Sequence, residues 1–263
     1  MFCIFYPVED EMMCKIGVFD SGIGGLTVLH SCVNRVEGEY YYYGDNLNAP
    51  YGTKSEEEIY ALSKRAFELF LRLRVDAAVI ACNTVTAVCI DRLRREYPFP
   101  IVGTEPAVAL AAKHHKKCLL LATRATLSSE RVHKLLAAFP KTEFTLLAPD
   151  GLVEEIEKKR TELSRVDLSF LNGFSDVGVV LGCTHFVWLK ERIEKFFPVY
   201  DGNEGIASRL HAMIEGMKGT ENHILKGEEA REGMTLKTNK NVKICFLGGD
   251  FVKNYEIYEQ MFF

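Results

Sequence analysis

The sequence lacks the features that mark membrane, exported and nucleic-acid-binding proteins. No apolar stretch approaches the roughly 18 residues that a membrane-spanning helix needs. A short apolar patch near the amino terminus has no basic flank and is followed by acidic residues 9–11, which is not the pattern of an export signal. The 32 basic and 36 acidic side chains leave a net charge of −4, which gives no electrostatic case for binding nucleic acid. We expect neither a membrane nor a nucleic-acid partner.

The cysteines lack the spacing of a redox or zinc pair. There are eight of them and none forms a Cys-x-x-Cys motif, so without an export signal we expect free thiols and a cytoplasmic protein. A short basic run at residues 113–117 precedes an apolar segment. It indicates a solvated loop, with a phosphate or polyanion site as the alternative.

Short apolar segments, expected to be strands, alternate with longer amphipathic segments, expected to be helices. One helix has a clear start, because Ser55 and Glu58 form a capping box, and another ends at Pro98. This first series predicts strands at 15–20, 40–43 and 76–81, and helices at 26–36, 55–73 and 85–97.

A similar series then begins again. Segments 76–82 and 176–183 correspond closely, each with an acidic start, an apolar run and a terminal cysteine. The second series predicts strands at 118–122, 143–148 and 176–182, and helices at 128–139, 152–160, 163–171 and 188–197.

This alternation predicts an α/β fold with mostly parallel sheets flanked by helices. Two series predict two similar doubly wound domains, related by pseudo-twofold symmetry, with the active site between them. The last part of the chain is too small for a third domain, so we expect it to pack on the first. It contains a helix at 207–217, a polar stretch at 218–233, a strand at 242–247 and a helix from 250. The expected domains are 14–104 plus 205–263, and 105–204.

Two loops follow predicted strands of the first series. Residues 20–25 are glycine-rich but do not form the dinucleotide pattern G-x-G-x-x-G, because position 27 is Thr. The glycines favour a small anionic ligand at a helix amino terminus, with a structural turn as the alternative. We expect Asp20 either to lie at the carboxyl end of its strand, where ligands of such sheets bind, or to cap the helix that follows. The loop at 44–52 is expected to form a pocket wall or a surface connection.

Cys82 and Cys183 differ from the other cysteines in their polar neighbours. Asn83 and Thr84 follow the first, and Thr184 and His185 follow the second. A buried core role is the alternative, since free cysteine is among the most buried residue types. Zinc binding by Cys183 and His185 would need a second pair of ligands of recognisable spacing. Two thiols at the ends of equivalent strands could instead approach one ligand from opposite sides, as inversion of a stereocentre requires.

Four segments in these positions together resemble the signature set of glutamate racemases, in the cofactor-independent aspartate/glutamate racemase superfamily. They are 18–26, 49–52, 81–84 and 182–185, and order and spacing agree over about residues 14–255. Residues 1–12 lie outside the resemblance, and a start at Met12 or Met13 is an alternative to Met1. The resemblance implies interconversion of L- and D-glutamate without cofactor or metal, in a homodimer, supplying D-glutamate for peptidoglycan.

The resemblance also implies roles for individual residues. Cys82 takes the α-proton from D-glutamate with help from Asp20, and Cys183 takes it from L-glutamate with help from His185. Glu157 matches a further acidic position. Positions that match substrate contacts are Ser21, Pro50, Tyr51, Gly52, Asn83, Thr84, Thr123, Thr126 and Thr184.

The sequence departs from the family pattern in a few places. Val187 and Trp188 stand where the family usually has Pro and Leu after Phe186, and the missing proline is expected to loosen the start of that helix. Val85 and Gly202 also differ from the usual residues. These changes bear on fine specificity and rate.

Three other functions stay open from the sequence. They are racemisation of aspartate or another acidic amino acid, non-catalytic glutamate binding by a regulatory protein, and hydrolysis of amide bonds by one cysteine. The last would leave the second thiol unexplained.

Overall fold

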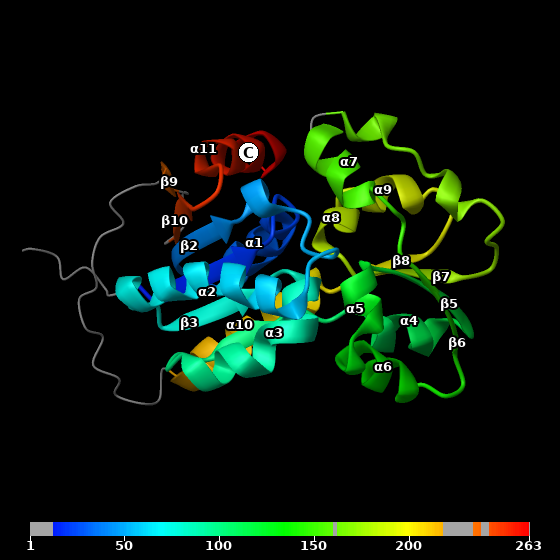
Figure 1. Cartoon of the computed structure of the whole chain (residues 1–263), viewed down its shortest axis with the longest axis horizontal. Coiled ribbons are helices and arrows are strands. Elements are labelled where there is room, and N and C mark those ends of the chain that lie inside the picture. Colours follow the sequence, from blue (N-terminus) through cyan, green and yellow to red (C-terminus); the bar gives the residue numbers. More distant parts are fainter. Residues whose placement is uncertain (1–12, 160–161, 218–233, 238–241, 263) are drawn as a thin grey trace, which may run out of the picture.

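A computed structural model describes residues 13–159, 162–217, 234–237 and 242–262. The predicted polar stretch at 218–233 and residues 1–12 lie outside the described residues. Two sheets, each flanked by helices, lie side by side in the elongated molecule (Figure 1).

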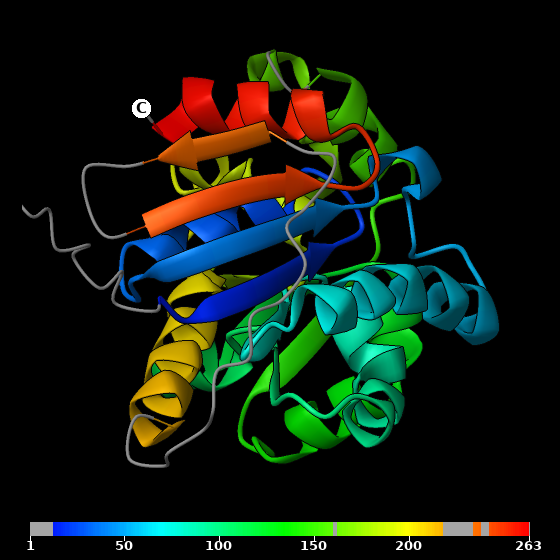
Figure 2. The same ribbon diagram turned by 90° about the vertical axis from the view of Figure 1, so that its left-hand side faces the viewer.

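The first sheet has six strands in the order β4-β3-β1-β2-β10-β9. All neighbours are parallel except β9 and β10, so the carboxyl ends of five strands lie at one edge (Figure 2). Its strands are β1 (Lys15–Asp20), β2 (Gly38–Gly44), β3 (Ala77–Ile80), β4 (Ile101–Gly103), β9 (Met234–Lys237) and β10 (Val242–Leu247). Its helices are α1 (Gly25–Val33), α2 (Glu56–Leu73), α3 (Asn83–Glu96), α10 (Asn203–Met217) and α11 (Phe251–Phe262).

The second sheet has four parallel strands in the order β6-β5-β7-β8. They are β5 (Lys117–Leu121), β6 (Glu143–Leu147), β7 (Gly178–Leu181) and β8 (Val199–Asp201). The helices of this part are α4 (Val108–His114), α5 (Arg124–Ser128), α6 (Glu130–Ala137), α7 (Leu152–Lys159), α8 (Thr184–Val187) and α9 (Lys190–Ile193). Three short 3-10 turns complete the described elements: η1 (Asn46–Asn48), η2 (Leu163–Arg165) and η3 (Ser169–Leu171).

The two sheets repeat one topology. The order β4-β3-β1-β2 in the first has the same sequence of crossovers as β8-β7-β5-β6 in the second. The predicted α/β fold with two similar doubly wound parts is therefore confirmed. β10 pairs with β2, which returns the last part of the chain to the first sheet. The division into two domains, 14–104 plus 205–263 and 105–204, stays a proposal. Helix α10 begins at Asn203, two residues before the proposed boundary.

Local sequence explains most elements. The central strands are apolar along their whole length and are buried on both faces, as expected for parallel strands covered by helices. The capping box predicted for α2 is present, since the Ser55 side chain accepts from the backbone N–H of Glu58 and the Glu58 carboxylate accepts from that of Ser55.

Two helix predictions are wrong in extent. The segment 163–171 contains only the two short turns η2 and η3, and the segment 188–197 contains only α9. The predicted helix at 128–139 is α6, which begins after Ser129, and the separate helix α5 that precedes it was not predicted. Ser129 caps α6 with its hydroxyl, which explains where that helix begins. Strands β4, β8 and β9 and helix α4 were not predicted, because runs of three to seven residues carry little periodicity.

Candidate active site

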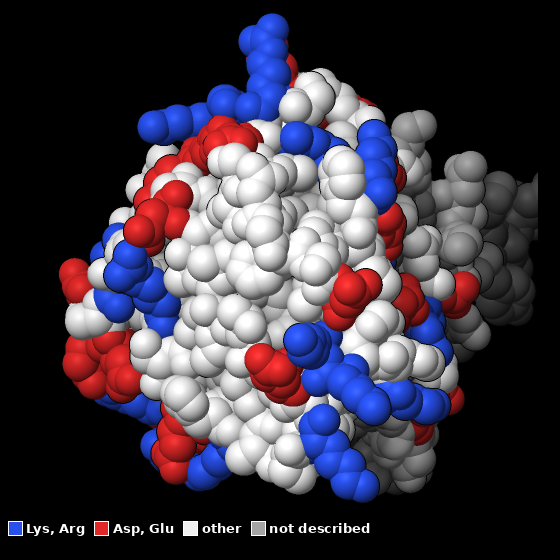
Figure 3. All heavy atoms as spheres, turned by 90° about the vertical axis from the view of Figure 1, so that its right-hand side faces the viewer, with Lys and Arg blue, Asp and Glu red and all other residues white. Residues whose placement is uncertain are grey.

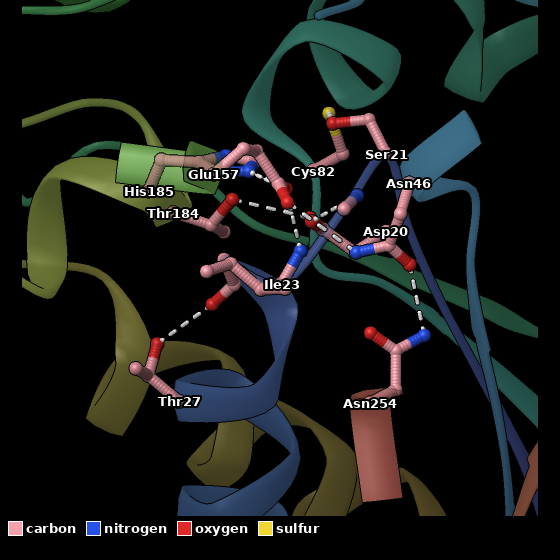
Figure 4. Close-up of polar contacts among 12 residues, drawn as sticks. Asp20, Ser21, Ile23, Thr27, Asn46, Cys82, Glu157, Thr184, His185 and Asn254 are labelled. Carbon is pink, nitrogen blue, oxygen red and sulfur yellow. Dashed lines mark hydrogen bonds and ion pairs between the residues drawn. The ribbon is translucent and has the colours of Figure 1, made fainter. Parts of the chain in front are cut away.

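Most predicted site residues lie in loops and first helical turns after β1, β3, β5 and β7, and several of them are labelled in Figure 4. Pro50, Tyr51 and Gly52 lie in the loop that follows β2. Strands β1, β3, β5 and β7 occupy equivalent central positions in the two sheets, and their carboxyl ends face each other across the boundary between the domains (Figure 1). Ligands of open parallel sheets bind at this edge. The repeated topology therefore brings together residues that are far apart in the sequence.

Asp20 ends β1 and is completely buried. Its carboxylate accepts hydrogen bonds from the backbone N–H of Gly22 at 3.0 Å and from the hydroxyl of Thr184 at 3.1 Å. Burial raises the pKa of Asp20 to about 6, and the positive charge of His185 and the hydrogen bonds limit the rise. A carboxyl group with such a pKa exchanges protons readily near neutral pH.

Cys82 is the N-cap residue of α3 and is 4% exposed. Its sulfur lies 3.4 Å from the hydroxyl oxygen of Ser21, on the loop after β1. Burial, with the nearby charge of Asp20, raises the pKa of Cys82 to about 12, and Cys183 adds to the rise.

Cys183 occupies the equivalent place in the second domain, as the N-cap residue of α8. His185 follows it, is 1% exposed, and places Nε2 at 2.7 Å from Oε1 of Glu157 on α7. Burial opposes a charge on His185, but hydrogen bonds with Cys183 and Glu157 outweigh it, so the pKa of His185 lies well above its ordinary value. The second thiol therefore has a cationic neighbour.

Glu157 also joins the two domains. Besides pairing with His185, its Oε1 accepts a hydrogen bond from the backbone N–H of Ile23 at 2.9 Å, in the glycine-rich loop of the first domain (Figure 4). Burial opposes ionisation of Glu157, but the bonds from His185 and Ile23 hold its pKa below the ordinary value. The sequence resemblance assigned this residue only an acidic position, and no local pattern indicated its two partners.

The glycine-rich loop makes close contacts with the second domain. A Cβ atom at Gly22 would lie 2.1 Å from Oε1 of Glu157, and one at Gly24 would lie 2.4 Å from the hydroxyl of Thr184. The anion at the start of α1 is the carboxylate of Asp20, which belongs to the chain itself. Binding of a small anionic ligand at this loop stays a prediction, and the structure adds that these glycines allow close approach of the second domain.

Three threonine hydroxyls meet where the start of α3 contacts the start of α5. Thr84 Oγ1 in α3 lies 2.9 Å from Thr123 Oγ1 and 3.3 Å from Thr126 Oγ1, and the latter two are 2.9 Å apart. Thr123 also caps α5 through the backbone N–H of Thr126. These hydroxyls come from both domains and could turn together toward a carboxylate.

Tyr51 and Gly52 connect the predicted pocket wall to this cluster. The Tyr51 hydroxyl donates to Asp45 at 2.6 Å, and the ring is 1% exposed. A Cβ atom at Gly52 would lie 2.5 Å from Cβ of Thr123, so the loop packs against the second domain. Pro50 precedes them with a cis peptide bond. Asp45 was not predicted, although an acidic residue directly after a strand was a signal available in the sequence.

Asn83 has an unused polar atom. Its side chain is 7% exposed, and Oδ1 is buried without a hydrogen-bond partner among the described residues. It borders a small recess between α3 and α6. A buried amide oxygen in this condition is suited to accept a hydrogen bond from a ligand donor such as an ammonium group.

The described part of the chain contains no group of three or more His, Cys, Asp or Glu side chains arranged to hold a metal ion. None of the helices described is both long and apolar enough to cross a membrane.

Comparison with known proteins gives a consistent result. The sequence profile of the Asp/Glu/Hydantoin racemase family matches residues 16–210. A glutamate racemase of Clostridium botulinum is 35% identical over 266 residues, covering 93% of this chain and 99% of the relative. A glutamate racemase of Clostridium acetobutylicum is 37% identical over 214 residues, covering 76% and 84%.

Solved structures agree with the sequence matches. The glutamate racemase of Campylobacter jejuni superposes with a TM-score of 0.70 at 27% identity, covering 94% of this chain and 97% of that chain. The Escherichia coli glutamate racemase, in complex with L-glutamate and the activator UDP-MurNAc-ala, superposes with a TM-score of 0.69 at 30% identity, covering 84% and 87%.

Proposed function

The chain belongs to the Asp/Glu/Hydantoin racemase family, and on that premise we propose that it interconverts L-glutamate and D-glutamate with two cysteines and no cofactor. The observation that carries the mechanism is the pair of buried thiols that cap equivalent helices, α3 and α8, after equivalent strands. A substrate carbon between the two sulfurs would present one face to each domain.

The proton transfers follow from this placement. With D-glutamate bound, the Cys82 thiolate removes the α-proton and the Cys183 thiol donates its proton to the opposite face of the carbanion. With L-glutamate bound, Cys183 removes the proton and Cys82 donates. Each turnover exchanges the protonation states of the two sulfurs, so protons must move between them before the next turnover in the same direction. Asp20 and His185 are the proposed carriers.

Electrostatics explain why the thiols need these neighbours. A pKa of about 12 for Cys82 makes its thiolate rare near neutral pH. The ammonium group of a bound amino acid would offset the charge of Asp20, which lowers that barrier. On the other side, the raised pKa of His185 places a positive charge beside Cys183. Acid–base groups contribute ~10² to 10⁴-fold to rate, so orientation and fixed dipoles must supply the remainder.

The polar residues around the thiols would bind the substrate. The hydroxyls of Thr84, Thr123 and Thr126 suit one carboxylate, and the hydroxyls of Ser21 and Thr184 lie beside the sulfur and Asp20. The free Oδ1 of Asn83 suits the ammonium group. Because these side chains are mostly buried, entry of glutamate requires the two domains to separate and close again.

We also propose an oligomeric state and a cellular location. The side of the molecule formed by the second domain carries few charges at its centre (Figure 3), and Leu110 in α4 and Leu146 in β6 are 51% and 38% exposed. An uncharged surface of this kind supports a homodimer. Free thiols with catalytic roles suit a reducing cytoplasm, where D-glutamate would be supplied for peptidoglycan.

Deuterated water tests the proposed reaction directly. Enzyme incubated with L-glutamate or D-glutamate should produce the opposite enantiomer with deuterium at the α-carbon, as measured by NMR and chiral chromatography. L- and D-aspartate are the matched substrates, and turnover of aspartate alone would contradict the assignment of glutamate. Binding of glutamate without deuterium incorporation or change in optical rotation would contradict catalysis altogether.

A further inference from the structure

The helix that carries the second catalytic pair is unusually short. α8 has only four residues, begins at Thr184 directly after Cys183, and contains His185. One helical turn contributes almost no stability of its own, so its position depends on packing. Trp188 ends this turn, and its backbone N–H donates to the carbonyl of His185 at 3.2 Å.

The side chain of Trp188 reaches the other domain. Its ring centre lies 6.2 Å from that of Phe262, in the last turn of α11, which packs on the first sheet. Phe262 in turn stacks on His30 of α1, with ring centres 4.0 Å apart and planes within 14°. Tyr258 completes the cluster at 4.9 Å from Phe262. An aromatic chain therefore runs from α8 to α11 and α1, across the domain boundary.

The contacts between Trp188, Phe262 and His30 are ring contacts. The indole N–H of Trp188 and Nδ1 of His30 are both buried without a hydrogen-bond partner among the described residues. Burial lowers the pKa of His30, which keeps the imidazole neutral against Phe262. Leaving two buried polar atoms unpaired costs stability. A contact retained at that cost points to a role for the rings themselves.

We infer that Trp188 is a positioning residue, which sets α8, and with it Cys183 and His185, against the first domain through its contact with Phe262. The inference rests on the proposed function. Trp188 lies three residues after His185, so the two side chains share one side of the turn. A displacement of about 1 Å at a catalytic group can lower the rate by ~10²-fold. Removing the ring should therefore impair proton transfer on the Cys183 side.

Kinetics of five variants test the contact. Trp188→Ala and Phe262→Ala should each lower kcat by roughly 10- to 100-fold, and the double variant should be no slower than the worse single variant. Trp188→Phe, which keeps a ring, should recover most of the activity. Phe196→Ala removes an aromatic side chain that is 74% exposed in the same domain, and is the control expected to resemble wild type.

Isotope effects separate positioning from simple loss of structure. The α-deuterium isotope effect on kcat should rise in Trp188→Ala with L-glutamate, whose proton Cys183 removes, and change less with D-glutamate. A merely structural role would reduce the amount of active enzyme and leave both isotope effects unchanged. Thermal unfolding of each variant reports whether it folds.

The composition provides a spectroscopic measurement, because Trp188 is the only tryptophan of the chain. Its emission should change when D-glutamate binds wild-type enzyme, and this change should shrink in Phe262→Ala. Trp188→Ala with wild-type kcat, or strictly additive effects in the double variant, would overturn the inference. Absence of racemisation by wild-type enzyme would instead overturn the proposed function.

Discussion

The two halves of the site share a backbone design but differ in chemistry. Each places a thiol as the N-cap of a helix after a central parallel strand. Beside Cys82 lies a buried carboxyl group, and beside Cys183 lies a histidine that is paired with a carboxylate. The first arrangement raises the pKa of its thiol to about 12, whereas the second places a positive charge beside the sulfur. The repeated fold therefore places the two thiols in equivalent positions but surrounds them with different charges.

This difference between the two sides can change only some of the kinetic constants. Two enantiomers have equal free energies, so the equilibrium constant of racemisation is unity and kcat/KM must be the same in both directions. The different neighbours of the two thiols can make kcat differ between the directions only if KM differs by the same factor. They can also make the isotope effects and the pH dependence of kcat differ between the directions. These quantities are where the comparison can be tested.

Removal of either thiol should have the largest effect. Cys82→Ser and Cys183→Ser should each lower racemisation by at least about 10³-fold, because a serine hydroxyl is a far weaker acid and neither transfer can be skipped. Cys89→Ser, which changes another buried thiol in α3, is the matched control and should retain activity. Polarimetry measures all three. Substantial turnover in either catalytic variant would rule out the two-base scheme.

The Glu157–His185 pair should come next. Glu157→Gln removes the charge that raises the pKa of His185, and we expect kcat to fall by roughly 10- to 100-fold with L-glutamate. Glu155→Gln is the control on the same helix, since among the described residues Glu155 forms an ion pair with Lys159 and not with His185. The alkaline limb of the kcat profile should also move to lower pH in Glu157→Gln. An unchanged profile would show that Glu157 does not control the histidine.

Asp20 links activity to stability. Its pKa is raised from 3.8 to about 6 in the folded protein, so the folded state binds the proton more tightly. The resulting stabilisation is complete below pH 3.8 and is lost as the pH rises through about 6. Asp20→Asn should remove this dependence, and at pH 8 should raise the free energy of unfolding by up to about 3 kcal/mol while lowering kcat.

Urea unfolding at pH 5 and pH 8 measures that stability change. The exposed Asp91→Asn is the control and should behave as wild type at both pH values. If Asp20→Asn loses stability at pH 8 instead, the carboxylate is held by its hydrogen bonds more strongly than burial opposes it.

The threonine cluster should have the smallest effect. Thr123→Val removes one of three hydroxyls and should raise KM for both enantiomers by about fivefold, which corresponds to one hydrogen bond of ~1 kcal/mol. Thr123→Ser keeps the hydroxyl and is the control. A fall in kcat at unchanged KM would place this hydroxyl beside the reacting carbon and not at a substrate carboxylate.

Much of the fold was predictable because its signals are local. Strand β1 was predicted with correct bounds, and the capping box at Ser55 is present as expected. Thiols followed by polar residues marked both halves of the site, since their neighbours differ from those of core cysteines. The break between α5 and α6 at Ser129 was not predicted, because five residues of α5 carry little periodicity.

The sequence by itself determined the alternation of strands and helices and the position of each thiol after a strand, because periodicity and capping act over a few residues. Only the tertiary structure decided which side chains meet across the domain boundary. Glu157 bonds to Ile23 over a separation of 134 residues, and Thr184 bonds to Asp20 over 164. Such contacts follow from the packing of two folded domains, which no local pattern encodes.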